Sequence, residues 1–349
     1  MAYGGVIDDV RYATGYEKTT RLPVFLCSEP FDLRWYGKYT PEEIGRNGEK
    51  MAEVCLAAIE EFDYDWAWLH VDDFFDLEPL GLQTRAGENG PRQVIGSARL
   101  PATRETLSQL AVPDPWTAGR MPERLKAIEI IRTRLEERVM VTGTCSGPYT
   151  AACLLFGEEA IAQLRQHDRP LLAEICDFLA AVESEWVSAQ VDAGAQTIWV
   201  DDRLANSRRL TPAQWRELAL PACRKLTAEI RTTSALTYLH NEESALPSLE
   251  ALRELYPDII NCGPGTDMTA AARAFRAKIC FGGNLDPVLL QQGTAEQIAA
   301  EVERLVAIAY AEGGYIFCTG GLVTPDTPVQ NMRALVAAIH RAGSVGWPG

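Results

Sequence analysis

The chain has 349 residues, 47% of them hydrophobic and 23% charged, which is enough to bury a large core. Its formal net charge of −15 and isoelectric point near 4.8 exclude nucleic acid and anionic membranes as expected partners, because both surfaces would repel it. The first residues do not have the pattern of a secretory signal, and no apolar run is long enough to span a bilayer. We therefore expect a cytoplasmic protein.

Eight apolar segments rich in β-formers alternate with segments of helical periodicity. They predict strands over Leu22–Cys27, Trp66–His70, Val139–Cys145, Thr197–Asp202, Ala235–His240, Ile259–Cys262, Lys278–Asn284 and Tyr315–Cys318. The segments between them predict amphipathic helices, among others over residues 41–62, 121–139, 211–230 and 294–313. Eight βα units favour a (β/α)8 TIM barrel, formed as one domain over residues 1–349. An open doubly wound sheet is the alternative, but no glycine-rich nucleotide-binding motif follows a strand.

Two segments fall outside the repeating units. Residues 1–20 precede the first strand and are expected to form an N-terminal extension. Residues 74–122 are rich in Gly, Pro and polar side chains and are too long for a simple loop between strand and helix. We expect this second segment to be an excursion over the barrel mouth.

Polar and thiol side chains stand at the ends of several predicted strands, where a parallel barrel places its active site. They are Asp201, Asp202, His240, Cys262, Asn284 and Cys318. Because all strand ends of a barrel meet at one mouth, we expect these side chains to converge on a single site.

Several stretches resemble one known superfamily between about residues 20 and 340. They are RLPV, GPYTAACLLFG, AGAQTIWVDD, TYLH, GGNLDP followed by QGTAEQIAAEV, and GGYIFCTGGLVTPDTPVQN. The chain resembles the superfamily that contains uroporphyrinogen decarboxylases and the zinc-dependent methyltransferases that take methyl groups from a corrinoid protein. Proteins that share a fold often have different functions, so the activity has to be argued from individual residues.

The decarboxylase branch is matched at few functional positions. Its N-terminal arginine motif, which holds substrate carboxylates, is replaced by CSEPFDLRWYGKYTPEE, where only Lys38 is in a similar setting. The family tyrosine and the histidine of its Gly-His-Gly motif would fall at Leu154 and Gly321. Asp72 resembles the decarboxylase aspartate and is the one acid carried over as a catalytic candidate.

The methyltransferase branch carries a zinc motif of His-x-Cys followed by a distant Cys. Here His240 and Cys318 match, and Glu242 replaces the middle Cys. Cys262 follows at the end of the next strand, which is similar to the ligand set of cobalamin-independent methionine synthase. The resemblance therefore implies Zn²⁺ bound by His240, Glu242, Cys262 and Cys318, with Glu242 as the ligand that yields to an incoming thiol.

This resemblance also implies the reaction and its partners. A corrinoid-binding protein would deliver methylcorrinoid, and a small thiol or other small molecule would accept the methyl group. Asp202 and Asp72 are then catalytic candidates, and Asp201 and Asn284 are expected to contact the substrate or the corrinoid. His70 is a further candidate to face the pocket.

Alternative interpretations stay open at this point. His240 taken alone suits a hydrogen-bonded core histidine, the two cysteines suit small buried hydrophobes, and Glu242 suits the first turn of a helix. The paired aspartates are equally suited to capping, and Asn284 to shaping a turn. Two other functions compete: a lyase for a cyclic carboxylate, which requires cationic groups such as Arg34, Lys38 or Arg203, and a binding barrel without catalysis.

Overall fold

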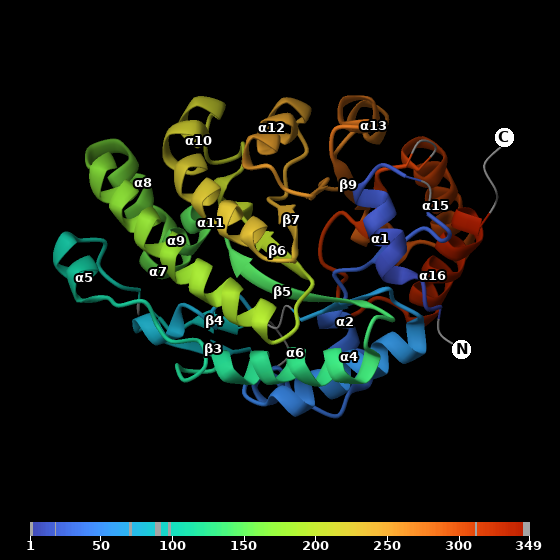
Figure 1. Cartoon of the computed structure of the whole chain (residues 1–349), viewed down its shortest axis with the longest axis horizontal. Coiled ribbons are helices and arrows are strands. Elements are labelled where there is room, and N and C mark those ends of the chain that lie inside the picture. The colour runs from blue at the N-terminus through green and yellow to red at the C-terminus, as the bar shows by residue number, and fades with distance from the viewer. Residues whose placement is uncertain are drawn as a thin grey trace.

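The computed structural model describes residues 3–17, 19–69, 72–87, 92–96, 99–310 and 313–344. All eight predicted strands are present, and they form one parallel sheet in the order β1-β10-β9-β8-β7-β6-β5-β2. The strands are β1 (Val24–Phe25), β2 (Trp66–Trp68), β5 (Met140–Ser146), β6 (Thr197–Asp201), β7 (Leu236–His240), β8 (Ile259–Asn261), β9 (Cys280–Leu285) and β10 (Tyr315–Thr319). Helices surround this sheet, so the architecture is the expected (β/α)8 barrel (Figure 1).

The sheet is nearly closed, and Asp65 connects its two end strands. The backbone N–H of Val24 on β1 donates to Asp65 Oδ2 at 2.9 Å, and the N–H of Asp65 donates to the carbonyl of Val24 at 3.3 Å. The carbonyl of Asp65 accepts from Met140 N at 2.9 Å. One carboxylate and its backbone thus provide the hydrogen bonds that a longer pair of end strands would make.

The helices that pack around the strands are amphipathic and bury their apolar side against the sheet. They include α4 (Gly48–Phe62), α6 (Met121–Leu135), α7 (Pro148–Phe156), α9 (Arg169–Asp192), α11 (Leu220–Thr232), α13 (Met268–Phe275), α15 (Ala295–Ala309) and α16 (Val329–Ser344). Shorter helices are α1 (Val6–Thr14), α2 (Glu29–Tyr36), α3 (Pro41–Gly45), α5 (Arg104–Gln109), α8 (Glu158–His167), α10 (Pro212–Leu218), α12 (Leu246–Ala251) and α14 (Pro287–Gln292). Among the described residues, no helix has the length and apolar character needed to cross a membrane.

Two predicted helices are each divided in two. The predicted helix over residues 41–62 breaks before Gly48, where the side chain of Asn47 accepts from Lys50 N and caps a new helix. The predicted helix over residues 211–230 breaks at Ala219, because Pro221 lacks the N–H that would continue the hydrogen-bond ladder.

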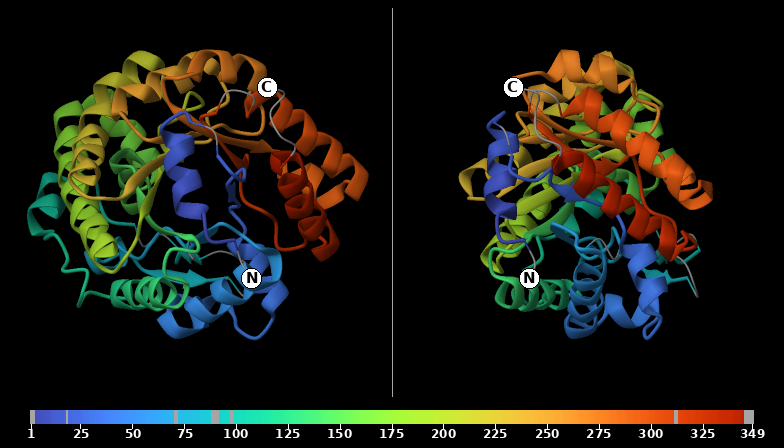
Figure 2. Two further views of the ribbon diagram at one scale, coloured as in Figure 1. Left: turned by 45° about the vertical axis from the view of Figure 1, so that its right-hand side comes forward. Right: turned by 90° about the vertical axis from the view of Figure 1, so that its right-hand side faces the viewer.

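Aromatic side chains fill the barrel interior. The rings of Phe25, Trp199 and Tyr238 lie 4.9–5.2 Å apart, and Trp66 and Trp68 pack around Phe25. Apolar side chains of α1 join the same cluster, and α1 lies across one end of the barrel (Figure 2). This end is the bottom, because Tyr16 contacts Gly314, which directly precedes β10. A filled interior leaves the mouth as the place where a ligand can enter.

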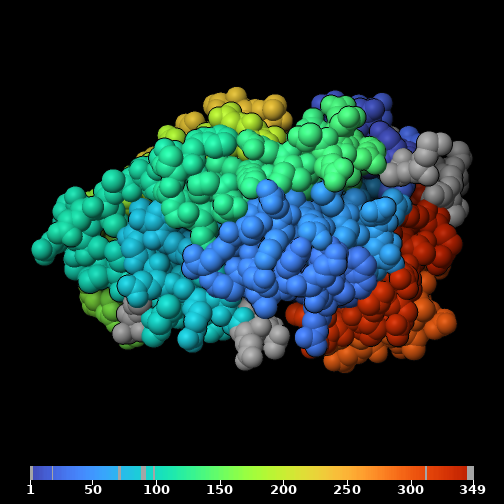
Figure 3. Space-filling view, turned by 90° about the horizontal axis from the view of Figure 1, so that it is seen from below, coloured from blue at the N-terminus to red at the C-terminus, as the bar shows by residue number. Residues whose placement is uncertain are grey.

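The excursion has secondary structure of its own. It contains the one-turn 3-10 helix η1 (Glu78–Leu80), the antiparallel strands β3 (Thr84–Ala86) and β4 (Arg92–Val94), and α5. Arg92 forms an ion pair with Glu42 of α3 at 2.5 Å, and Leu100 N donates to Leu155 O of α7 at 3.2 Å. In Figure 3 the excursion, in cyan to teal, lies beside the blue residues of α2 to α4.

Candidate functional site

His240 ends β7, and its ring is held between two neighbours at the barrel mouth. The imidazole stacks on the ring of Trp199 with centroids 4.8 Å apart and an interplanar angle of 26°. Its Nδ1 lies 3.1 Å from Oδ1 of Asn261 on the adjacent strand β8. Because an amide oxygen only accepts, Nδ1 carries the proton and the lone pair of the neutral ring is on Nε2.

Asn261 connects this histidine to Cys318. While its Oδ1 accepts from His240, its Nδ2 lies 3.2 Å from Sγ of Cys318 on β10. All three side chains are buried, with exposed fractions of 8% for His240, 1% for Asn261 and 0% for Cys318. One buried amide thus joins two residues that are 78 positions apart in the sequence.

The thiol of Cys318 has two further titratable neighbours. Cys27, which follows β1, and Tyr238 of β7 both lie close to it. Burial, followed by the contact with Cys318, raises the pKa of both Cys27 and Tyr238 well above their usual values. Both groups therefore favour their neutral, protonated forms. Asn261 Nδ2 donates to the buried sulfur between them.

Tyr238 reaches this position because the neighbouring strand has a glycine opposite its hydroxyl. A Cβ atom added to Gly282 of β9 would lie 2.0 Å from the hydroxyl oxygen of Tyr238. No side chain fits in that space, so Gly282 is required for the placement of the tyrosine.

Cys262 lies on the other side of its strand. Successive side chains of a strand point to opposite faces, and β8 ends at Asn261, which faces His240 and Cys318. Cys262 instead belongs to the core between strands and helices, is 0% exposed, and has its pKa raised to about 12 by burial. Cys262 was expected at the mouth as the last residue of the predicted strand, whereas the alternation of side chains places Asn261 on the inner face.

Glu242 is directed toward the protein surface. Its side chain is 40% exposed and forms an ion pair with Arg208 at 3.5 Å. Its backbone is in the left-handed region, with φ of 53°. The residues on both sides of it are buried, so the loop turns outward at this one position.

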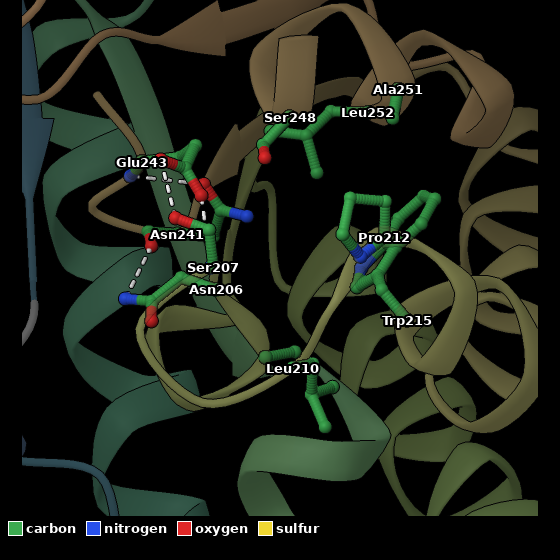
Figure 4. Close-up of a pocket in the computed structure, with 11 residues that line it drawn as sticks. Asn206, Ser207, Leu210, Pro212, Trp215, Asn241, Glu243, Ser248, Ala251 and Leu252 are labelled. Atoms are coloured by element: carbon green, nitrogen blue, oxygen red, sulfur yellow. Dashed lines mark hydrogen bonds between the residues drawn. The ribbon is translucent and has the colours of Figure 1, made fainter. Parts of the chain in front are cut away.

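The neighbouring Glu243 holds this loop in place. Its carboxylate accepts from Ser207 N and Oγ at 2.9 and 3.0 Å, and from Ser244 N and Ala245 N at 2.8 and 2.7 Å. Figure 4 shows Glu243, Asn241 and Ser207 on the polar side of a hollow whose opposite side is formed by Pro212, Trp215 and Leu252. These four hydrogen bonds hold the backbone that follows Glu242.

The predicted zinc ligands are therefore only partly brought together. His240 and Cys318 lie on the two ends of Asn261, whereas Glu242 is at the surface and Cys262 faces the helices. Within the described ranges, no group of three or more His, Cys, Asp and Glu side chains is placed to hold a metal ion. A zinc site needs at least three protein ligands, so this arrangement does not fit the four-residue set.

Asp201, the last residue of β6, and Asp202, which follows it, make contacts with different parts of the protein. Asp201 forms an ion pair with Arg203 and also accepts from the backbone N–H of that residue at 3.1 Å. Asp202 accepts from Thr150 Oγ1 of α7 at 3.0 Å, and burial raises its pKa to about 7. Asp202 thus connects β6 to α7, while Asp201 lies in register with His240.

Asn284 shapes the loop after β8. Its Nδ2 donates to the carbonyls of Gly263 at 3.0 Å, Pro264 at 3.3 Å and Thr266 at 3.0 Å. The side chain is 5% exposed, so its amide holds this loop near Cys262.

Asp72 is enclosed by arginines. Its two oxygens accept from Arg120 at 3.0 Å each, and Arg92 approaches to 3.2 Å. A carboxylate in a bidentate ion pair is held in one orientation, so the hydrogen-bonding capacity of Asp72 is satisfied by the protein itself. His70, two residues earlier, lies outside the described residues.

The cations that a carboxylate lyase would use are also engaged or distant. Arg203 is paired with Asp73 and Asp201, and Lys38 pairs with Glu53 at 3.2 Å on the surface. Arg34 is exposed on α2.

Asn261 and Cys27 are the site residues that sequence reasoning did not identify. Both come at the end of a predicted strand, as His240 and Cys318 do. The resemblance drew attention to metal ligands alone, and neither Asn261 nor Cys27 belongs to the zinc motif.

Comparison with known proteins gives one consistent family. The family model described as Uroporphyrinogen decarboxylase (URO-D) matches residues 9–342. The uroporphyrinogen decarboxylase of Nitrosomonas europaea is 30% identical over 339 residues, covering 88% of this chain and 90% of the relative. That of Geobacter metallireducens is 27% identical over 338 residues, covering 92% and 94%.

Two solved structures share the fold. A methyltransferase from Methanosarcina mazei superposes with a TM-score of 0.86 at 24% identity, covering 96% of this chain and 98% of that chain. A B12-independent methionine synthase from Shewanella sp. W3-18-1 superposes with a TM-score of 0.55 at 14% identity, covering 84% and 85%. At these identities the likeness concerns the barrel and not the reaction.

Proposed function

Since the chain belongs to the uroporphyrinogen decarboxylase family, we propose that it is an enzyme that transfers a methyl group from a methylated corrinoid to a small thiol. The corrinoid would be carried by a partner protein that docks at the barrel mouth. The observation that carries this proposal is the connection of His240, Asn261 and Cys318 at three strand ends. A methyltransferase is among the proteins that share this fold, so the barrel is compatible with the reaction.

The residues of this chain suit the proton transfer that the reaction requires. A thiol accepts a methyl group only after it has lost its proton. Asn261 places the lone pair of His240 on Nε2, and this nitrogen is the proposed acceptor of the thiol proton. As the new C–S bond forms, the electron pair of the broken bond between methyl group and cobalt stays with the corrinoid.

Cys318 is the second member of the proposed centre. Asn261 donates to its sulfur, and Cys27 and Tyr238 lie close to it, so this atom is held in place at the mouth. Zinc binding by His240 and Cys318 stays a proposal, and Glu242 joins them only if the loop from Asn241 to Ala245 rearranges. No step of the reaction is assigned to zinc.

The test uses methylcobalamin as donor and 2-mercaptoethanol as acceptor, with demethylation followed by the absorbance of the corrinoid. His240→Gln and Cys318→Ser should each lower the rate by about tenfold or more. Cys280→Ser is the matched control, because Cys280 is also a buried interior cysteine but begins β9 at the other end of the barrel. Rates that fall equally in all three variants, or in none, would contradict the proposal.

Metal analysis by mass spectrometry separates the zinc question from the reaction. If zinc binds as proposed, the wild type holds about one zinc per chain and Cys318→Ala loses it. If Glu242→Gln also loses zinc, the loop rearranges to supply a third ligand. If the wild type holds no zinc but transfers methyl groups, the His240–Cys318 centre acts without it.

A lyase for a carboxylate substrate is the second candidate, and the decarboxylase relatives favour it. The arrangement of Asp72 argues against it, since Arg92 and Arg120 satisfy this carboxylate. Release of carbon dioxide from uroporphyrinogen, measured with the same preparation, would distinguish the lyase from the methyltransferase. Decarboxylation without methyl transfer would establish the lyase.

A further inference from the structure

The indole of Trp199 lies directly beneath the imidazole of His240. Trp199 belongs to β6 and is in register with Tyr238 of β7, two residues before the histidine. Side chains two residues apart on a strand share a face, so Trp199 and Tyr238 form the layer of the barrel interior just below His240. The indole reaches up from this layer and stacks on the imidazole, with ring centroids 4.8 Å apart and 26° between the planes.

The indole is itself held by other rings of the barrel interior. It packs on Tyr238 of the adjacent strand at 4.9 Å, on Phe25 of β1 at 5.2 Å and on Trp68 of β2 at 5.8 Å. These three contacts are tilted or edge-on, with interplanar angles of 54°, 56° and 69°. Trp199 is 2% exposed, so its ring is a fixed surface on which another ring can rest.

The hydrogen bond between Nδ1 of His240 and Asn261 does not by itself fix the plane of the imidazole. The torsion that turns a histidine ring about its Cβ–Cγ bond has a broad energy minimum, and a hydrogen bond tolerates about 30° of deviation from linearity. A flat surface under the ring removes this freedom, because tilting the imidazole drives one edge into the indole and lifts the other away. The amide therefore fixes where Nδ1 points, and the indole fixes the plane in which Nε2 lies.

We propose that Trp199 is a positioning residue whose aromatic face holds Nε2 of His240 in the direction from which it takes the proton of the methyl acceptor. This role rests on the proposed function, because that function supplies the proton. The orientation of the imidazole, however, is measured without any reaction. Trp199 acts through the ring that it supports rather than on the substrate.

Trp66 is the matched control for a role in core packing alone. It belongs to the same interior cluster, is also 2% exposed, and packs on Phe25 at 5.2 Å and on Tyr238 at 6.5 Å. Trp66 is in register with Met140, the first residue of β5, so it lies toward the bottom of the barrel. Replacing either tryptophan with Leu creates a similar defect in the core, but only Trp199 lies under the histidine.

The first measurement is nuclear magnetic resonance of the full chain with ¹³C-labelled histidine rings, without methyl donor or acceptor. The chain has four histidines, so the signal of His240 is assigned by its loss in His240→Gln. We expect an order parameter of about 0.85 for the ring of His240 in the wild type, as in other rigid groups, and below about 0.6 in Trp199→Leu. Trp199→Phe keeps an aromatic face and should keep the ring ordered, and Trp66→Leu should leave it ordered as well.

The second measurement is methyl transfer from methylcobalamin to 2-mercaptoethanol. Trp199→Leu should lower kcat by about tenfold or more and leave KM for the thiol nearly unchanged, because the substrate still binds beside a misplaced base. Trp199→Phe should recover most of the rate, and Trp66→Leu should keep it.

Circular dichroism of each variant checks that the fold is kept, and Trp199→Met, whose flexible side chain fills gaps, replaces Trp199→Leu if that variant does not fold. A ring of His240 that stays ordered in the folded Trp199 variant would overturn the proposal. Equal loosening in Trp66→Leu would overturn it too, since core packing would then explain the effect. If the wild type transfers no methyl group, the proposed function fails, and the ordering of His240 still decides whether Trp199 positions it.

Discussion

Replacing Asn261 with Leu removes both hydrogen bonds of the bridging amide and keeps the number and branching of its side-chain heavy atoms. Each buried hydrogen bond contributes about 0.5–1.5 kcal/mol, and the N–H left unpaired on His240 costs roughly 1–3 kcal/mol. Burial of the apolar leucine offsets part of this, so we expect a loss of roughly 2 kcal/mol in the free energy of unfolding. Urea denaturation followed by circular dichroism measures it.

The same substitution should lower methyl transfer by about 10- to 100-fold, because the imidazole loses the partner that orients it. Asn331→Leu is the matched control, since Asn331 is also a buried asparagine with two hydrogen bonds, to Leu290 O at 2.8 Å and Gly293 O at 3.0 Å. That control should lose stability but not activity. An Asn261→Leu protein with wild-type stability and rate would refute the role of the bridge.

Three further outcomes follow from the structure. Gly282→Ala places a methyl group 2.0 Å from the hydroxyl of Tyr238, so we expect roughly 1–3 kcal/mol of destabilisation in urea, and an unchanged midpoint would show that the tyrosine moves freely. Arg120→Met leaves Asp72 without its bidentate partner and should cost roughly 3–5 kcal/mol, part of which the double variant with Asp72→Asn should recover in thermal unfolding. Burial raises the pKa of Asp202 from 3.8 to about 7, so the folded state binds this proton more tightly and the contribution of Asp202 to stability falls as pH rises from about 4 to about 7. Asp202→Asn should therefore flatten the pH dependence of the unfolding free energy across that range, and an unaltered slope would contradict the assignment.

The positions of the site residues show how far local sequence patterns can predict which side chains face the barrel mouth. His240 and Cys318 were placed at strand ends from the sequence, and both are at the mouth. Cys262 was placed there by the same reasoning, but the alternation of side chains puts Asn261 on the inner face and Cys262 on the opposite one. Apolar segments buried on both sides do not reveal which residues face inward, because both faces of the strand are hydrophobic.

The sequence by itself determined the eight strands and their helical connections, because hydrophobic periodicity and turn residues act over short stretches of chain. Only the tertiary structure decided which side chains meet. The contact of Cys27 with Cys318, the bridge through Asn261 and the stacking of His240 on Trp199 join residues from distant segments. Glu242 illustrates the same limit: its direction is set by the hydrogen bonds of Glu243 to Ser207, which no local pattern encodes.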